Sequence, residues 1–123
     1  MVNKIDVFII DDDANNMQYF QTIIKRDDNI RCIGSTSSGN SAISIIKTVR
    51  PDIVLIDYAL YPISGFDLLD LLRVEIPNLP IILLGGRATL QEKAEDAGAS
   101  AYLPTPITPR NLIDTIIKVA EQE

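Results

Sequence analysis

A strict alternation of strand and helix patterns, repeated five times, restricts the fold of this chain more than any other feature of its sequence. Short apolar runs rich in β-branched residues predict strands at residues 4–10, 30–36, 53–56, 80–84 and 100–103. After each run, apolar residues recur at helical spacing, which predicts helices at residues 14–26, 38–50, 65–74, 88–97 and 109–120. This alternation predicts an α/β domain in which helices cover both faces of a parallel sheet.

The run at residues 53–56 is apolar at every position, as expected of a strand that is buried on both faces of a parallel sheet. For five such units the natural arrangement is flavodoxin-like, with the strands in the order 2-1-3-4-5. The first and third strands are then neighbours, and the chain reverses direction between them. Ligands of open α/β sheets bind at this point, beyond the carboxyl ends of the strands.

Length and composition agree with a single domain, residues 1–123, which a longer protein could join to a C-terminal effector. No apolar run approaches the roughly 20 residues of a membrane helix, and the first residues do not resemble a secretory signal. We therefore expect a cytoplasmic protein without membrane contact. The net charge of -6 argues against direct binding to nucleic acid, because phosphate contacts dominate that affinity.

Carboxylates stand at the ends of the first and third predicted strands: Asp11, Asp12 and Asp13 follow one, and Asp57 follows the other. Neighbouring carboxylates repel unless a cation lies among them, and a hard ion such as Mg²⁺ prefers oxygen ligands. The cation would also neutralise an incoming phosphoryl group, so that a carboxylate could form an acyl phosphate. The alternative is structural, since Asp12 or Asp13 could cap the helix that begins near residue 14.

Three segments resemble response-regulator receiver domains, and together the resemblance covers essentially the whole chain. Residues 9–12 resemble the family's acidic pair, residues 51–57 the strand that delivers the phosphoacceptor, and residues 98–102 the approach to the fifth strand. The resemblance implies a two-component signalling module, not an enzyme, whose Asp57 accepts a phosphoryl group from a histidine kinase. It also implies Mg²⁺ ligands, namely Asp12, Asp57 and the carbonyl of Ala59, with Asp11 helping through water.

Two positions depart from the pattern of that family. Gly85 stands where the family has Thr or Ser, and Thr105, before Pro106, stands where it has Lys. The hydroxyl and the ammonium that contact the phosphoryl group are missing, so we expect weaker phosphoryl binding and switching. Arg87 could act as a substitute cation, although a solvated arginine is the simpler interpretation. The backbone N–H groups of Gly85 and Gly86 could still face the phosphoryl oxygens.

Two further expectations concern the last part of the sheet. Tyr102 matches the switch aromatic of the family, but its usual hydroxyl partner is missing. We therefore favour a half-buried tyrosine whose hydroxyl meets water. Thr105 could offer a weak hydroxyl contact, but a spacer role is the preferred interpretation. The family has a cis bond before the matching proline, so we expect Thr105–Pro106 to be cis.

Other functions compete with the phosphoacceptor interpretation. Gly85 and Thr105 favour a pseudo-receiver, a phosphorylation-independent interaction or dimerisation module. The spacing of Asp11 and Asp13 mimics that of haloacid-dehalogenase-like phosphatases, but the lysine and later acids of those enzymes are missing. A flavin-binding function is not favoured either, because no phosphate loop follows the first strand.

By the resemblance, the fourth helix, fifth strand and fifth helix form the face for a homodimer or a fused effector. Residues 30–34 resemble receivers joined to helix-turn-helix or pilus-assembly ATPase domains.

Overall fold

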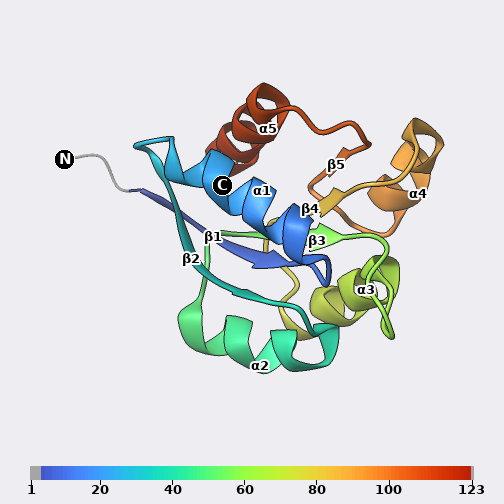
Figure 1. Cartoon of the computed structure of the whole chain (residues 1–123). Coiled ribbons are helices and arrows are strands. Elements are labelled where there is room, and N and C mark those ends of the chain that lie inside the picture. Colours follow the sequence, from blue (N-terminus) through green and yellow to red (C-terminus); the bar gives the residue numbers. More distant parts are fainter. Residues whose placement is uncertain (1–3, 123) are drawn as a thin grey trace.

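The computed structural model describes residues 4–122 and contains a five-stranded sheet. Its strands are β1 (Ile5–Ile10), β2 (Ile30–Thr36), β3 (Ile53–Asp57), β4 (Ile81–Leu84) and β5 (Ala101–Leu103). Neighbouring strands pair in parallel, in the order β2-β1-β3-β4-β5. The order expected from the sequence is confirmed, and it places β1 beside β3 (Figure 1).

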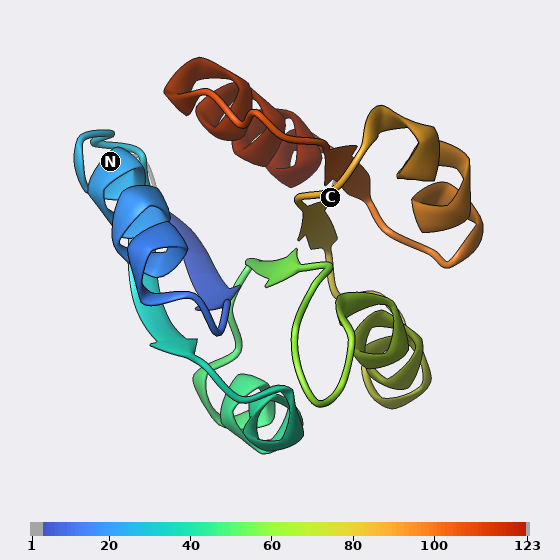
Figure 2. The ribbon, with the colours of Figure 1, turned by 45° about the vertical axis from the view of Figure 1, so that its right-hand side comes forward.

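The helices cover both faces of this sheet. They are α1 (Ala14–Lys25), α2 (Gly39–Val49), α3 (Gly65–Glu75), α4 (Gln91–Asp96) and α5 (Pro109–Glu121). Figures 1 and 2 show α1 and α5 on one face, α2 and α3 on the other, and α4 beside β5. The flavodoxin-like α/β class is confirmed. Within residues 4–122, the helices are too short or too polar to cross a membrane.

The alternation of side chains along β3 shows why both faces need a covering layer. Ile53 and Leu55 join the core that α1 and α5 close, whereas Val54 and Ile56 join the core that α2, α3 and α4 close. All four side chains are fully buried. Burying a side chain of this size stabilises the fold by about 1.5–3 kcal/mol. The strand is therefore held firmly on both faces immediately before Asp57.

The fourth helix differs from the single helix that the sequence predicts over residues 88–97. The chain first forms a 3₁₀ turn, Ala88–Leu90, and α4 follows over Gln91–Asp96. Arg87 precedes the turn and provides no side-chain cap, and 3₁₀ turns of this kind are frequent at the N-termini of α-helices. The end is as expected, because Gly98 has a φ of 95° and donates its N–H to the Glu95 carbonyl. Other element boundaries differ from the expected ones by one residue at most.

Candidate functional site

The carboxyl ends of β1 and β3 bring three carboxylates together. Ile10 pairs in register with Ile56, so the next residues along the two strands, Asp11 and Asp57, are neighbours. One carboxylate oxygen from each of Asp11, Asp12 and Asp57 lies within 4.8 Å of the others. The clustering expected from the strand order is confirmed, and the cluster lies where the chain reverses direction between β1 and β3.

Backbone N–H groups orient the two inner carboxylates. Oδ1 of Asp11 accepts a hydrogen bond from the N–H of Asp13 at 2.9 Å. Oδ1 of Asp57 accepts one from the N–H of Ala59 at 3.3 Å. Each of these bonds spans two residues, as in the turns that Asp commonly makes with its own backbone. The two carboxylates are thus positioned by the loops that immediately follow the strands.

The helix-capping alternative applies to Asp13, which lies outside the cluster of three carboxylates. Oδ1 of Asp13 accepts from the N–H of Asn16 at 3.0 Å and caps α1. Asp12 is exposed and accepts instead from the N–H of Tyr61 at 3.1 Å, which joins the end of β1 to the loop after β3. Capping by Asp12 is therefore wrong, and Asp12 belongs with Asp11 and Asp57.

The cluster carries negative charge that nearby cations do not balance. Asp11 is only 2% exposed, and its Oδ2 atom is buried without a hydrogen-bond partner. Burial raises the pKa of Asp11 to about 6; the N–H of Asp13 opposes this shift and the neighbouring carboxylates add to it. Burial also raises the pKa of Asp57. The ion pairs among residues 4–122 lie elsewhere, namely Arg31–Asp6, Lys47–Glu75 and Arg110–Asp114.

An oxygen-ligated divalent cation fits this set of groups. It would give the buried Oδ2 of Asp11 the partner it lacks and would relieve repulsion among the three carboxylates. Ala59 lies two residues beyond Asp57 and is exposed. Its role as a ligand stays a prediction.

A pair of glycines after β4 shapes the wall beside Asp57. Gly85 and Gly86 have φ angles of 91° and 83°, which residues with a side chain rarely adopt. A Cβ atom on Gly85 would lie 3.1 Å from Oδ1 of Asp57 and 3.2 Å from Cδ1 of Tyr58. The N–H of Gly85 donates to the Leu103 carbonyl at 2.9 Å. The Gly85 N–H is therefore already used by β5, whereas the expectation that the Gly86 N–H faces a phosphoryl group stays a prediction.

Thr105 is hydrogen-bonded to the glycine loop. Its Oγ1 donates to the Gly86 carbonyl at 3.1 Å, and its backbone N–H donates to the same oxygen at 3.0 Å. These bonds support the spacer role for Thr105. The cis peptide expected at Thr105–Pro106 is confirmed.

Tyr102 is buried and its hydroxyl is bonded to the protein. The side chain is 5% exposed, and its hydroxyl lies 2.6 Å from the Gly85 carbonyl oxygen and 2.7 Å from that of Arg87. The expectation of a half-buried tyrosine with a water-facing hydroxyl is therefore wrong, because the turn at Gly85 brings two acceptors within its reach. The Arg87 side chain is exposed and, within residues 4–122, forms no ion pair with Asp57.

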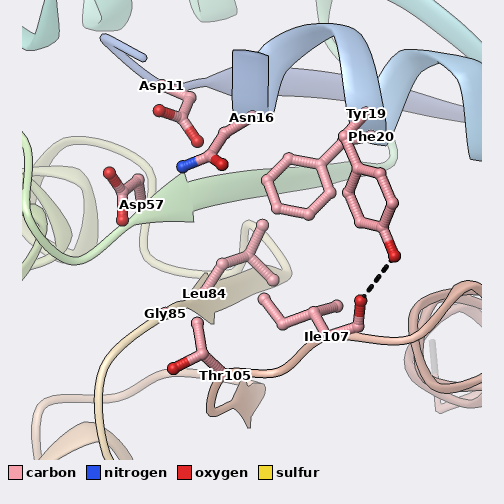
Figure 3. A pocket seen from close by; sticks show the side chains of 9 residues that line it. All are labelled: Asp11, Asn16, Tyr19, Phe20, Asp57, Leu84, Gly85, Thr105 and Ile107. Atoms are coloured by element: carbon pink, nitrogen blue, oxygen red, sulfur yellow. Dashed lines mark hydrogen bonds between the residues drawn. The ribbon is translucent and has the colours of Figure 1, made fainter.

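A cavity of about 110 Å³ lies beside Asp57 (Figure 3). Two of its lining residues are bonded to each other, because the hydroxyl of Tyr19 donates to the Ile107 carbonyl at 2.8 Å. Nothing in the sequence marked the α1 residues of this cavity as ligand-facing, since the apolar face of α1 is equally expected to cover the sheet. No sequence signal indicated Ile107. The lining residues are Asp11, Asn16, Tyr19, Phe20, Asp57, Leu84, Gly85, Thr105 and Ile107.

The strand order and the acidic cluster together define a doubly wound α/β domain with a ligand site at its topological switch point. Residues 7–117 match the response regulator receiver domain family, and the chain belongs to that family. It is therefore a receiver domain of two-component signalling, a signalling module rather than an enzyme, of the kind that pairs with histidine kinases. Its acidic triad is typical of the Mg²⁺ site of such domains.

Comparisons with individual proteins agree with this assignment. The nitrate/nitrite response regulator protein homolog of Haemophilus influenzae is 30% identical over 100% of this chain, which covers 60% of that protein. A protein-glutamate methylesterase/protein-glutamine glutaminase of Pyrococcus abyssi is 31% identical over 93% of the chain, which covers 33% of that protein. The chain thus spans three fifths or less of the length of these relatives.

Among solved structures, a two-component response regulator of the LuxR family from Aurantimonas sp. SI85-9A1 superposes with a TM-score of 0.90 at 20% identity. The match covers 98% of this chain and 88% of that chain. At this level of identity the similarity supports the fold.

Proposed function

We propose that Asp57 accepts a phosphoryl group from a partner histidine kinase in the cytoplasm, with Mg²⁺ bound at the acidic cluster. Asp12, Asp57 and the Ala59 carbonyl would hold the ion, and Asp11 would act through water. The observation that carries this proposal is the grouping of three carboxylates within 4.8 Å, one of them with a buried and unpartnered oxygen. Mg²⁺, when bound, would neutralise both the carboxylates and the phosphoryl oxygens.

In the proposed transfer, a carboxylate oxygen of Asp57 attacks the phosphorus atom of a phosphohistidine. An O–P bond forms as the N–P bond breaks, and the electron pair of the broken bond remains on the imidazole nitrogen, which takes a proton from water. The N–H of Ala59 holds Oδ1 of Asp57, so Oδ2 is the proposed nucleophile. Asp11 and Asp12, the two carboxylates beside Asp57, keep the local electrostatic potential negative. This potential favours binding of the metal before the phosphoryl transfer.

We also propose that phosphorylation switches this domain only weakly. Gly85 has no side chain to offer, and the hydroxyl of Thr105 is engaged by the Gly86 carbonyl. A hydrogen bond to a charged group contributes about 1.5–3 kcal/mol. Moving a two-state equilibrium from 1:99 to 99:1 requires about 5.5 kcal/mol of differential binding. The loss of two such contacts therefore removes a large part of the free energy that could drive a switch.

A pseudo-receiver is the second candidate function, and the position of Tyr102 favours it. Its hydroxyl already bonds inside the domain in the unphosphorylated chain. The face formed by α4, β5 and α5 would then stay in one state and could serve a homodimer or a fused effector without phosphate. The intact cluster of Asp11, Asp12 and Asp57 favours the first candidate.

Acyl-phosphate formation from acetyl phosphate distinguishes the two candidates. We expect acid-stable, base-labile phosphorylation of the chain that requires Mg²⁺ and disappears in Asp57→Asn. Asp70→Asn removes the same charge from an exposed position on α3 and should be phosphorylated like the parent chain. If the parent chain stays unmodified with Mg²⁺ present, the pseudo-receiver function is favoured.

A further inference from the structure

The cavity beside Asp57 combines an acidic end with apolar walls (Figure 3). Its volume of about 110 Å³ exceeds the roughly 30 Å³ that one water molecule occupies in the liquid. Asp11 and Asp57 form the acidic end, and Phe20, Leu84 and Ile107 contribute apolar side chains. A matching ligand has a positive head and a short apolar body.

The acidic end lacks a counter-charge. Asp11 is 2% exposed, lines the cavity, and has an Oδ2 atom without a hydrogen-bond partner. No ion pair among residues 4–122 includes Asp11 or Asp57. Asn16 extends from α1 towards these acids in Figure 3, but a neutral amide does not balance two carboxylates. Because an unpaired charge is costly to bury, this end of the cavity favours a cation.

Hydrogen bonds fix the groups around the cavity. The hydroxyl of Tyr19 donates to the Ile107 carbonyl at 2.8 Å, which joins α1 to the loop before α5. Oγ1 of Thr105 donates to the Gly86 carbonyl at 3.1 Å, so this hydroxyl is already engaged. Gly85 contributes no side chain. The space is therefore defined by bonded groups and is available to a ligand from outside the chain.

The cavity and the proposed metal position share Asp11 and Asp57 but differ in their other residues. Asp12 belongs to the carboxylate cluster but does not line the cavity, and neither does Ala59. A cation in the cavity would share Asp11 and Asp57 with the metal without occupying its place. The three carboxylates of the cluster can balance one divalent ion and one ammonium together, so simultaneous binding of both is expected.

We propose that the cavity binds a primary alkylammonium group, supplied by a free amine or by a lysine side chain of a partner protein. The ammonium has three divergent N–H donors, which suit carboxylates that come from two different strands. A guanidinium is a planar fork and suits a single carboxylate better. The methylene stem would contact Phe20, Leu84 and Ile107. This inference rests on the proposed function for its consequence, which is that the ammonium stabilises a phosphoryl group on Asp57.

Titration with n-butylammonium chloride, followed by amide NMR shifts, tests the proposal. We expect saturable shifts at residues 16–20, 84–86 and 105–107, with and without Mg²⁺. The neutral analogue 1-butanol should bind at least about tenfold more weakly, because it has the same chain length and lacks the charge. Equal shifts with sodium chloride at the same ionic strength would overturn the proposal.

Variants that occupy the cavity provide the second test. Thr105→Lys places an ammonium on the chain itself beside the cavity, and Ile107→Phe fills the space without a charge. Both should abolish the n-butylammonium response. Thr48→Lys makes the same change as the first variant on the exposed side of α2 and should retain the response. A response that survives in the folded cavity variants contradicts the proposal.

Two further arms identify the source of the ammonium and separate this proposal from the phosphoacceptor function. Binding of Nα-acetyl-lysine methylamide supports a lysine of a partner protein, whereas binding of n-butylammonium alone supports a free amine. Phosphorylation by acetyl phosphate without an n-butylammonium response rejects the cavity proposal and keeps the phosphoacceptor function. The reverse result keeps the binding site and rejects phosphorylation of Asp57.

Discussion

At the scale of single residues, Asp11 shows how position changes the chemistry of a common side chain. Its backbone continues from β1, and its side chain is 2% exposed. One oxygen accepts the N–H of Asp13, and the other lacks a hydrogen-bond partner. Loss of water disfavours the charged form, and the pKa of Asp11 rises to about 6. The carboxylate therefore destabilises the metal-free fold near neutral pH.

This shift predicts a pH dependence of stability in the absence of divalent ions. The folded chain holds the Asp11 proton up to about pH 6, whereas the ordinary pKa is 3.8. The free energy of unfolding should therefore fall as pH rises through this interval. At pH 7, Asp11→Asn should be more stable than the parent chain by about 1–3 kcal/mol. Urea unfolding in EDTA from about pH 4 to pH 7 measures this difference.

The control for this experiment is Asp70→Asn, which removes an exposed carboxylate. Its stability relative to the parent chain should change little over the same range. Mg²⁺ should stabilise the parent chain more than Asp11→Asn, because the variant lacks one carboxylate of the cluster. A stability difference for Asp11→Asn that is the same at every pH would contradict the role of burial.

Gly85 gives a second prediction at the residue scale. Its φ of 91° and the 3.1 Å approach of a Cβ atom to Oδ1 of Asp57 both oppose a side chain. Gly85→Ser should therefore lower the free energy of unfolding by about 1–2 kcal/mol instead of restoring a receiver-like hydroxyl. Gly39→Ala is the matched control, because its Cβ would meet its nearest neighbour at 3.6 Å. Thermal unfolding of both variants, with beryllofluoride binding as a second measurement, decides whether the loop adapts.

At the scale of elements, the sequence predicted nearly all of the strands and helices, but not the turns and side-chain contacts that connect them. The alternation and periodicity of apolar residues indicated every strand and the helices α1, α2, α3 and α5, because burial on a sheet enforces those patterns. It did not predict the 3₁₀ turn before α4, because the apolar pattern does not distinguish a 3₁₀ turn from the first turn of an α-helix. It also did not predict that the guanidinium of Arg73 donates both to the nearby Leu79 carbonyl and to the Gly98 carbonyl, which is 25 residues away in the sequence.

The same distinction applies to the candidate site. The acidic triad could be predicted because strand order alone brings Asp11 and Asp57 together. The state of Tyr102 could not, since it depends on the carbonyl directions that two positive φ angles impose. The cavity could not be predicted either, because its volume is what remains after every neighbouring side chain is placed.

The end of α2 provides a prediction about an element. Arg50 is the C-cap residue of this helix and has a left-handed conformation, with φ 50° and ψ 63°. That conformation costs an L-residue roughly 1–2 kcal/mol, and glycine avoids the cost but loses more chain entropy on folding. Arg50→Gly should therefore raise the free energy of unfolding by about 0.5–1 kcal/mol, whereas Arg50→Ala should not. The midpoint of urea unfolding at unchanged slope measures this effect, and equal midpoints for both variants would exclude strain at this cap.

At the scale of the whole molecule, the site and the proposed output face are connected by the glycine loop. The Gly85 carbonyl accepts the hydroxyl of Tyr102, and the N–H of Gly85 bonds to Leu103 in β5. Asp57 lies on the other side of the same glycine. A change at Asp57 could reach β5 through this loop, but Tyr102 is already buried before any phosphoryl group arrives.

Phosphorylation should therefore change self-association through the face of α4, β5 and α5 by much less than a full switch would. Tyr102 has one hydroxyl proton and two carbonyl acceptors within 2.7 Å, so the inward position is well satisfied without phosphate. Any dimer on this face must rely on area and shape, because exposed ion pairs contribute little. Sedimentation of the chain with and without beryllofluoride and Mg²⁺ should show a similar sedimentation coefficient.

Tyr102→Phe keeps the ring and removes the hydroxyl, so it should restore sensitivity to beryllofluoride if that bond holds the face in one state. A large, saturable rise in the dimer of the parent chain would show instead that the switch operates without a side chain at Gly85 and without a lysine at Thr105.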